Sequence, residues 1–309
     1  MSHHHMPKLE PNDIIDVVAP SGGVTSQDLS TIEEYIAKLG YKARIPDNLC
    51  SDKCSYLAND DETRHQLLIQ ALTCQKSKAV WCVRGGYGAA RIAPKLANMT
   101  PPCTPKWLIG FSDNTALHII LNQFWNWPSI HASVLLQHIQ DKIDSQSKSR
   151  VFDILKNNTS TLTFDKLAPL NEASSKADHT IDSQIVGGNM TLIQTSIGTN
   201  WQLTPTSSIL FLEEINEEHY RIDRILTQLT QINLFNGVDA VIIGDIIYNT
   251  EHLSQCDAVL NWANSINVPV LHCPNIGHGT TNMPIIFNSP ATLNLGNHPT
   301  LTCYHGAPQ

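Results

Sequence analysis

The sequence has few charged residues and lacks the charge pattern of a nucleic-acid-binding protein. Charged side chains make up 16% of its 309 residues, the formal net charge is −8, and no run of five like charges occurs. A nucleic-acid partner requires a basic stripe or patch, so we expect no nucleic acid to bind. The acidic excess is too mild to indicate any other partner.

Long apolar runs are also absent. No uncharged apolar segment is long enough to cross a membrane, and the N-terminal segment MSHHHMPKLEP has no apolar core typical of a secretion signal. We therefore expect no membrane partner and a cytoplasmic location. A hydrophobic content of 41% indicates a globular chain with a sizeable core, and the length suits one large or two ordinary domains.

Two common site motifs are missing. The eight cysteines form no Cys-x-x-Cys pair, which argues against a zinc ribbon or a thioredoxin-type redox site. Reduced thiols in a cytoplasmic protein are the better interpretation. No Gly-Lys-Ser/Thr sequence occurs, so the chain has no P-loop.

The first half of the chain alternates strand and helix patterns. Strands are expected at 14–20, 41–45, 78–83 and 106–110, each followed by helical periodicity. The first helix is expected to have Ser26 as its N-cap and to end at glycine 40. This alternation predicts a parallel sheet with helices on both faces, in a flavodoxin-like or Rossmann-like N-terminal α/β domain.

The polar segment 156–184 interrupts this alternation. We interpret it as a linker that contains one short strand, TLTF, between an N-terminal domain at 9–155 and a C-terminal domain at 185–309. The C-terminal part again alternates strands and helices and then ends in strand-rich sequence. A smaller, β-rich α/β domain is therefore expected there.

Three glycine- or serine-bearing turns end predicted strands of the first domain: APSGG (19–23), RGGYG (84–88) and GFSD (110–113). Parallel strands end at a common edge, where open α/β sheets bind ligands, so the three turns should meet. Ser112 would lie on this edge. It is either a helix N-cap or a nucleophile on a tight strand-to-helix turn, and Asn114 stands where the nucleophile pattern has glycine. RGGYG is either a phosphate-binding turn, simply a tight turn, or a source of backbone N–H donors.

A serine nucleophile needs a base and an acid that orients it. Among 14 histidines, His278 has the most functional context, because it lies in the loop PNIGHGTTNMP after an apolar strand. His118 and His131 are expected to be packing residues. The acid candidates are Glu213 and Glu214, although an ion pair to an arginine of the following helix, 221 or 224, would explain them equally well.

Five segments together resemble the LD-carboxypeptidase family of serine peptidases, in order from about residue 12 to 300. They are YLANDDETRHQLLIQAL with KAVWCVRGGYGAARIAPKL, then LIGFSDNTALH, IVGGNMTLI, ILFLEEINEEHYRIDRILTQL and NIGHGTTNMPI. The resemblance implies that Ser112 is the nucleophile, His278 the base and Glu213 the orienting acid. It also implies that the N–H groups of Gly86 and Asp113 form the oxyanion hole.

The same resemblance implies a two-domain homodimer without cofactor or metal, which acts on muropeptides or other small peptides in the cytoplasm. Murein-recycling members remove the terminal D-alanine from tetrapeptides, and a sister branch cleaves microcin C-type peptidyl-nucleotides. Asn189 matches a family position near the substrate, and Arg84 is a candidate for reading the terminal carboxylate. A non-catalytic ligand-binding relative stays open as an alternative. SIHASV and MPIIF depart from the family pattern near the pocket walls, which puts substrate preference in doubt.

Overall fold

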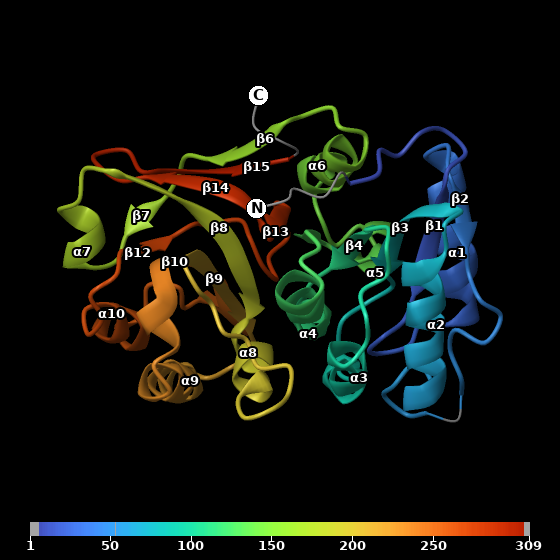
Figure 1. Cartoon of the computed structure of the whole chain (residues 1–309), viewed down its shortest axis with the longest axis horizontal. Helices are drawn as coiled ribbons and strands as arrows, with labels where there is room; N and C mark the ends of the chain where they lie inside the picture. Colours follow the sequence, from blue (N-terminus) through green and yellow to red (C-terminus); the bar gives the residue numbers. More distant parts are fainter. Residues whose placement is uncertain (1–5, 53, 306–309) are drawn as a thin grey trace.

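The computed structural model describes residues 6–52 and 54–305, so the start of the segment MSHHHMPKLEP lies outside the described residues. Two β-sheets lie side by side, each with helices around it (Figure 1). Between the two sheets, helix α4 of the first half faces strand β8 and helix α8 of the second half (Figure 1).

The first sheet has the strand order β13-β5-β4-β3-β1-β2. Its strands are β1 (Ile14–Val18), β2 (Lys42–Arg44), β3 (Ser77–Cys82), β4 (Trp107–Gly110), β5 (Ser129–His131) and β13 (Ile285–Phe287). The first five are parallel; the first four of these were predicted, and β5 was not. β13 is antiparallel to β5. The second half of the chain therefore supplies the edge strand of the first sheet.

Helices cover both faces of this sheet, also as predicted. They are α1 (Ser26–Lys38), α2 (Asp61–Thr73), α3 (Ala89–Ala97), η1 (Ser112–Asn114), α4 (Thr115–Ile119), η2 (Ile120–Phe124), α5 (Leu135–Ile139) and α6 (Ser145–Leu155). Val80 and Cys82 of β3 belong to the core cluster that includes α2, α3 and α4. Ala79 and Trp81, which point to the opposite face, belong to the cluster with α1, α5 and α6.

The expected N-cap of the first helix was wrong by one residue. Thr25, not Ser26, caps α1: its side chain accepts the Asp28 N–H, and the Asp28 carboxylate accepts the Thr25 N–H. This reciprocal capping box satisfies two backbone donors, whereas Ser26 is already helical.

The second sheet has the order β6-β15-β14-β8-β9-β10-β12-β7, with β11 paired to β10. Its central strands β8, β9, β10 and β12 are parallel and its outer strands are antiparallel. Strand bounds are β6 (Thr161–Phe164), β7 (Ala168–Pro169), β8 (Thr180–Asn189), β9 (Ser208–Ile215), β10 (Val238–Tyr248), β11 (Glu251–His252), β12 (Val270–His272), β14 (Ser289–Asn294) and β15 (Thr300–Tyr304). Its helices are α7 (Glu172–Ser175), α8 (Met190–Ser196), α9 (His219–Gln231), η3 (Leu234–Gly237) and α10 (Asp257–Ala263).

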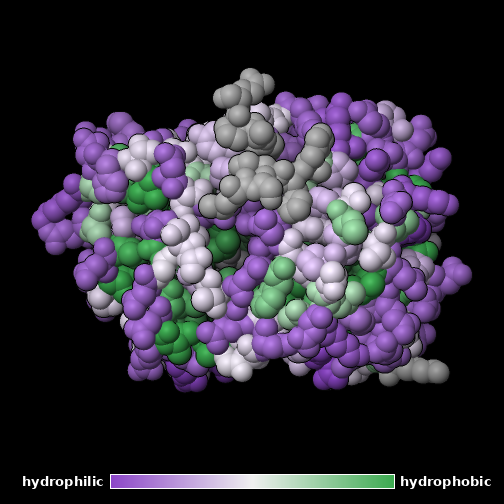
Figure 2. Space-filling model, in the orientation of Figure 1, coloured by the Kyte–Doolittle hydropathy of each residue, from purple (hydrophilic) through white to green (hydrophobic). Residues whose placement is uncertain are grey.

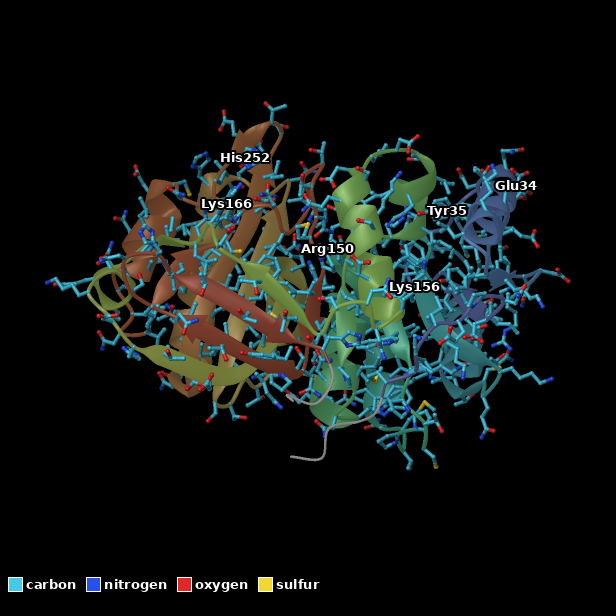
Figure 3. All side chains as sticks on the ribbon, turned by 90° about the horizontal axis from the view of Figure 1, so that it is seen from above. Glu34, Tyr35, Arg150, Lys156, Lys166 and His252 are labelled. Atoms are coloured by element: carbon cyan, nitrogen blue, oxygen red, sulfur yellow. The ribbon has the colours of Figure 1, made fainter. Side chains whose placement is uncertain are left out.

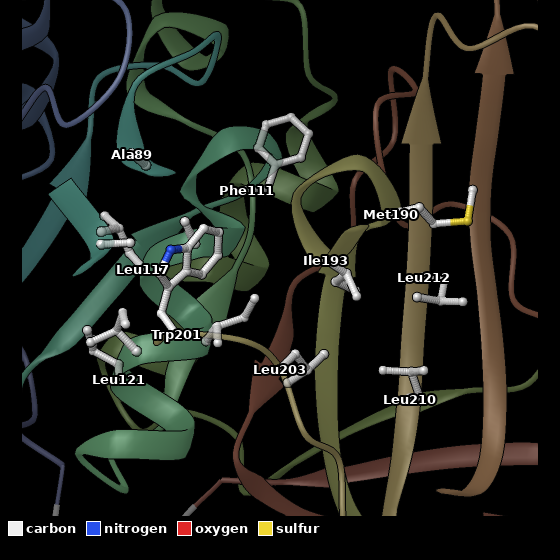
Figure 4. Packing of buried hydrophobic residues seen from close by; sticks show 14 of the residues in the cluster. Ala89, Phe111, Leu117, Leu121, Met190, Ile193, Trp201, Leu203, Leu210 and Leu212 are labelled. Carbon is white, nitrogen blue, oxygen red and sulfur yellow. The ribbon is translucent and has the colours of Figure 1, made fainter. Parts of the chain in front are cut away.

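The predicted TLTF strand exists as β6, at the outer edge of the second sheet. The proposed boundaries of the two domains and of their linker remain a prediction. One hydrophobic cluster runs through both halves, with α4 and η2 on one side and α8 and β9 on the other (Figure 4). Leu117, Met190 and Leu212 are among its fully buried members.

Hydrophilic side chains predominate on the face shown in Figure 2, with smaller hydrophobic patches between them. Four large hydrophobic side chains are exposed among the described residues: Leu39, Tyr56, Tyr87 and Tyr220. Within residues 6–52 and 54–305, every helix is too short or too polar to cross a membrane.

Candidate active site

The three predicted turns meet at one edge of the first sheet, because β1, β3 and β4 are neighbouring parallel strands. The Gly22 N–H donates to the Gly85 carbonyl oxygen at 3.2 Å. A Cβ atom placed on Gly85 would lie 3.0 Å from the Ser112 Cβ and 3.1 Å from its Oγ. The glycine turn therefore leaves room for the serine, and the expected common edge is confirmed.

Ser112 adopts a backbone conformation that non-glycine residues rarely take. Its φ is +61°, in the left-handed region, where a side chain is strained by about 1–3 kcal/mol. The residue at the N-cap position of η1 is Phe111, and no side chain caps that helix, so the N-cap interpretation of Ser112 is wrong. A strained, half-buried serine between a strand and a helix has the geometry of a nucleophile turn.

Across the junction between the sheets, β9 and the loop after β12 bring Glu213 and His278 together. The Nδ1 atom of His278 lies 2.6 Å from Oε2 of Glu213, whose side chain is fully buried. Burial lowers the pKa of His278, but the charge and hydrogen bond of Glu213 outweigh it, so the pKa is raised overall. The His278 ring packs on Phe111, with ring centroids 4.6 Å apart, so it lies beside the residue that precedes Ser112.

Glu214, the other predicted acid, has a different set of partners. Its carboxylate accepts hydrogen bonds from the Asn189 side-chain amide and from the backbone N–H groups of Thr191 and Ile215, each at 2.8 Å. Burial, and then the neighbouring Glu213 charge, raise the pKa of Glu214. The geometry thus separates the two acids: Glu213 contacts the histidine, and Glu214 holds the start of α8.

The alternative ion pair with an arginine of α9 is wrong for both acids. Nη1 of Arg221 lies 3.4 Å from Oε2 of Glu217, and among the described residues no salt bridge joins either acid to an arginine.

The candidate oxyanion donors lie on the Ser112 turn and on the glycine turn that packs against it. Gly86 has a φ of +105° and is exposed on the turn, and Asp113 follows Ser112 directly. The Asp113 carboxylate accepts the Ala89 N–H at 2.8 Å, so it ties this turn to the first residue of α3. Burial raises the pKa of Asp113, against the lowering effect of its hydrogen bonds.

The two candidate substrate residues differ in their surroundings. Arg84 is exposed, donates from Nη1 to the Gly23 carbonyl at 3.2 Å and extends over the glycine turns. Asn189 is buried, donates to Glu214 and accepts the Leu192 N–H at 3.2 Å as the N-cap of α8. Arg84 is thus open to a ligand, whereas both ends of the Asn189 amide already have protein partners.

The two histidines expected to pack are fully buried, as predicted from their apolar context. His118 contacts the Ser129 hydroxyl and the Gly110 carbonyl, and burial lowers its pKa to about 4. His131 lies among the rings of Phe111, Phe211 and Phe287. Neither side chain is open to solvent.

Sequence reasoning missed two features near the site. Asp245 lies near the end of the buried part of β10, is 5% exposed and contacts the loop that carries His278. Its signal was available, since VIIGD ends an apolar strand in an acid just as SILFLE does. Tyr56 and Tyr87 are exposed rings whose centroids lie 5.9 Å apart, beside the glycine turn. Among the described residues, no group of three or more histidine, cysteine or acidic side chains could hold a metal ion.

Sequence comparison identifies relatives over most of the chain. The profiles of the LD-carboxypeptidase N-terminal domain and the LD-carboxypeptidase C-terminal domain match residues 15–132 and 182–293. A Rickettsia prowazekii protein named as a carboxypeptidase is 37% identical over 286 residues, which cover 92% of this chain and 88% of the relative. The murein tetrapeptide carboxypeptidase of Pseudomonas aeruginosa is 27% identical over 293 residues, 90% of this chain and 92% of the relative.

Comparison of structures gives the same fold. The microcin C7 self immunity protein MccF superimposes with a TM-score of 0.80 at 15% sequence identity, covering 97% of this chain and 98% of the other. At this identity the likeness concerns the fold.

Proposed function

Because the chain belongs to the LD-carboxypeptidase family, we propose that it is a serine peptidase that removes the terminal D-alanine from murein tetrapeptides. The observation that carries the proposal is the left-handed Ser112 at the sheet edge, packed against Gly85, with the His278 ring of the His278–Glu213 pair packed on the adjacent Phe111. Its murein-peptide substrate is proposed from the name of the Pseudomonas relative.

In the proposed mechanism, His278 takes the hydroxyl proton as Ser112 attacks the amide carbonyl. Glu213 accepts a hydrogen bond from Nδ1 of His278, which leaves Nε2 as the atom that removes the proton. The same contact stabilises the imidazolium that forms. His278 then protonates the leaving D-alanine amine, and a water molecule hydrolyses the acyl-enzyme with His278 again as base.

The N–H groups of Gly86 and Asp113 are proposed to hold the negative oxygen of the tetrahedral intermediate. Each such donor contributes about 3–4 kcal/mol in comparable sites. Both belong to turns whose backbone is fixed by neighbouring contacts, Gly86 through the Gly85–Gly22 hydrogen bond and Asp113 through its bond to α3. Fixed donors need no rearrangement as charge develops.

We propose that Arg84 binds the terminal carboxylate of the substrate. Its exposed guanidinium lies on the same turn as Gly86, and a guanidinium suits bidentate binding of a carboxylate. Asn189 is a weaker candidate for the substrate, because its amide is engaged with Glu214 and α8. A cytoplasmic homodimer that acts in peptidoglycan recycling is also proposed, on the family resemblance alone.

The deciding experiment is mass spectrometry of a murein tetrapeptide incubated with the wild type, with Ser112→Ala and with Ser30→Ala. Ser30 lies on the exposed face of α1 and serves as the matched control. Loss of one D-alanine with the wild type and Ser30→Ala, and none with Ser112→Ala, is expected. An intact tetrapeptide with all three proteins would contradict the murein substrate.

A second candidate function is cleavage of a microcin C-type aminoacyl-nucleotide. The fold likeness to the microcin C7 self immunity protein and the departures of SIHASV and MPIIF from the family pattern favour testing it. The same three proteins should then be incubated with an aminoacyl-nucleotide. Cleavage of this compound but not of the tetrapeptide would favour the second function. No cleavage of either by the wild type would favour a ligand-binding protein without catalytic activity.

A further inference from the structure

Asp245 is a buried carboxylate beside the proposed base that the mechanism above does not use. It lies near the end of β10, and its backbone N–H donates to the Ile276 carbonyl at 2.8 Å. Its Oδ1 atom accepts the Asn275 N–H at 3.4 Å. The backbone and the side chain of Asp245 thus both contact the loop that carries His278.

The loop is shaped around this carboxylate by two glycines. A Cβ on Gly277, which has a φ of +140°, would lie 3.2 Å from the Asp245 Cβ. A Cβ on Gly279 would lie 3.3 Å from Asp245 Oδ2. His278, between the two glycines, is therefore held by a segment that follows the surface of Asp245.

Five ionisable groups interact electrostatically with Asp245 or with His278, one of them the Cys273 thiol that follows β12. Glu213 and Glu214 approach from β9, His278 from the loop, and His252 from β11, on the exposed hairpin labelled in Figure 3. Burial raises the pKa of Asp245 to about 6, and hydrogen bonding to Asn275 and the His252 charge act against this rise. At neutral pH the side chain is mainly an anion.

A purely structural role does not account for this charge. A single hydrogen bond of 3.4 Å to a backbone N–H would be made equally well by an asparagine oxygen. A buried anion is unfavourable unless another charge or donor compensates it, and here a nearby acid adds repulsion. The group that gains from a negative Asp245 is His278 in its protonated form.

We propose that Asp245 is a positioning residue for the base: it fixes the loop of His278 and stabilises the imidazolium that forms during acyl transfer. The proposal rests on the proposed function for the part that concerns turnover. In this role Asp245 acts through His278 and makes no contact with the substrate. Glu213 orients the imidazole, and Asp245 supplies a second negative charge from the neighbouring strand β10.

The test compares Asp245→Asn with Asp239→Asn as a matched control. Asp239 lies on the same strand, at its other end, where it accepts the Ser183 hydroxyl. The first measurement is an NMR titration of the His278 imidazole, assigned by comparison with His278→Gln. We expect Asp245→Asn to lower the His278 pKa by about one unit, and Asp239→Asn to leave it unchanged.

The second measurement is the pH profile of D-alanine release. Asp245→Asn should lower kcat about tenfold with a KM within about twofold, and move the acid limb to lower pH. Asp245→Glu, which keeps the charge, should retain a His278 pKa close to that of the wild type. An unchanged His278 pKa in Asp245→Asn would overturn the proposal, even if kcat fell.

The two proposals fail separately. A wild-type protein that cleaves no substrate removes the proposed function, whereas the NMR titration still decides the role of Asp245. If Asp245→Asn does not fold, the NMR titration of His278 in the wild-type protein tests the role of Asp245 instead. The His278 resonance should then show an additional step near pH 6, from Asp245, and its absence would contradict the inference.

Discussion

Gly85 packs closely against Ser112, so a side chain at position 85 would press on the serine. In Gly85→Ala the new methyl group would lie 3.0 Å from the Ser112 Cβ, a distance shorter than nine in ten Cβ contacts in proteins. The serine turn must then shift, and a displaced nucleophile loses its alignment with the base and the oxyanion donors. We expect kcat to fall at least about 100-fold. Steady-state kinetics with a circular dichroism check of folding will measure this, and full activity would place the reacting atom elsewhere.

Glu213 and Glu214 are adjacent in sequence, yet different consequences are expected when each is replaced. Glu213→Gln removes the charge that orients His278, so kcat should fall about 10³–10⁴-fold with little loss of stability. Glu214→Ala leaves three donors without their acceptor, so the free energy of unfolding should fall by about 2–4 kcal/mol. Urea denaturation alongside kinetics separates the two effects. Equal losses of activity and stability in both variants would contradict the assignment of Glu213 to catalysis and Glu214 to stability.

The sequence contained enough information to propose Ser112, Glu213 and His278, because the motifs that carry them together resemble one family, although each motif alone is weak. Only the family resemblance distinguished Glu213 from Glu214, since side chains that alternate along a strand are separated by what packs on each face. The roles of Glu214 and Asp245 likewise depend on contacts with α8 and with the loop at 275–279. Such contacts are set by tertiary packing and leave no local pattern.

At the scale of elements, the Ser112 turn is connected to α3 through one side chain. Gly88 precedes α3 with a φ of +139° and has no side chain to cap the helix, so the Asp113 carboxylate caps it from another turn. Asp113→Ala should therefore lower the free energy of unfolding by about 1–2 kcal/mol. It should also lower kcat, because the Asp113 N–H loses its anchor. Thermal denaturation and kinetics check both effects, and Asp28→Ala, at the cap of α1, should lower stability only.

Most strands and helices of the first sheet could be predicted because their hydrophobic periodicity is strong and local. The strand β13 could not, since its three residues pair with β5 across more than 150 positions of the chain. The one-residue error at Thr25 arose because Thr25 and Ser26 are both good N-caps, and only the reciprocal bond with Asp28 distinguishes them.

For the whole molecule, we expect that neither half folds alone. The two halves share one hydrophobic cluster, and the second half supplies strand β13 to the first sheet. A fragment of residues 9–155 would lose β13 from its sheet edge and the cover of α8 over α4, which exposes side chains such as Leu117 (Figure 4). Burial of each such side chain stabilises the fold by about 1.5–3 kcal/mol. Exposing several of them would therefore cost more than the typical stability of a domain, about 5–15 kcal/mol. We expect poorly dispersed NMR spectra for 9–155, and recovery of dispersion on mixing with 156–309. A well-dispersed spectrum of the fragment alone would show independent domains.

Stability of the intact protein should also depend on pH through Asp245. The pKa of this carboxyl is about 6 in the folded state against an ordinary value of 3.8, so the folded protein holds a proton that the unfolded chain has released. Stability contributed by this group is therefore present below about pH 4 and lost as the pH rises through 6. Asp245→Asn has no carboxyl group at this position to ionise, so the variant should not lose this stability as the pH rises.

At pH 7.5 we accordingly expect the free energy of unfolding of Asp245→Asn to exceed that of the wild type by about 2–3 kcal/mol, with a higher unfolding temperature. Near pH 4 the two proteins should unfold at the same temperature. Thermal denaturation across this range, with Asp239→Asn as control, measures the difference. A variant that is both more stable and less active is the expected sign of a buried charge retained for its effect on His278. A variant less stable at every pH would assign Asp245 to the structure of the loop.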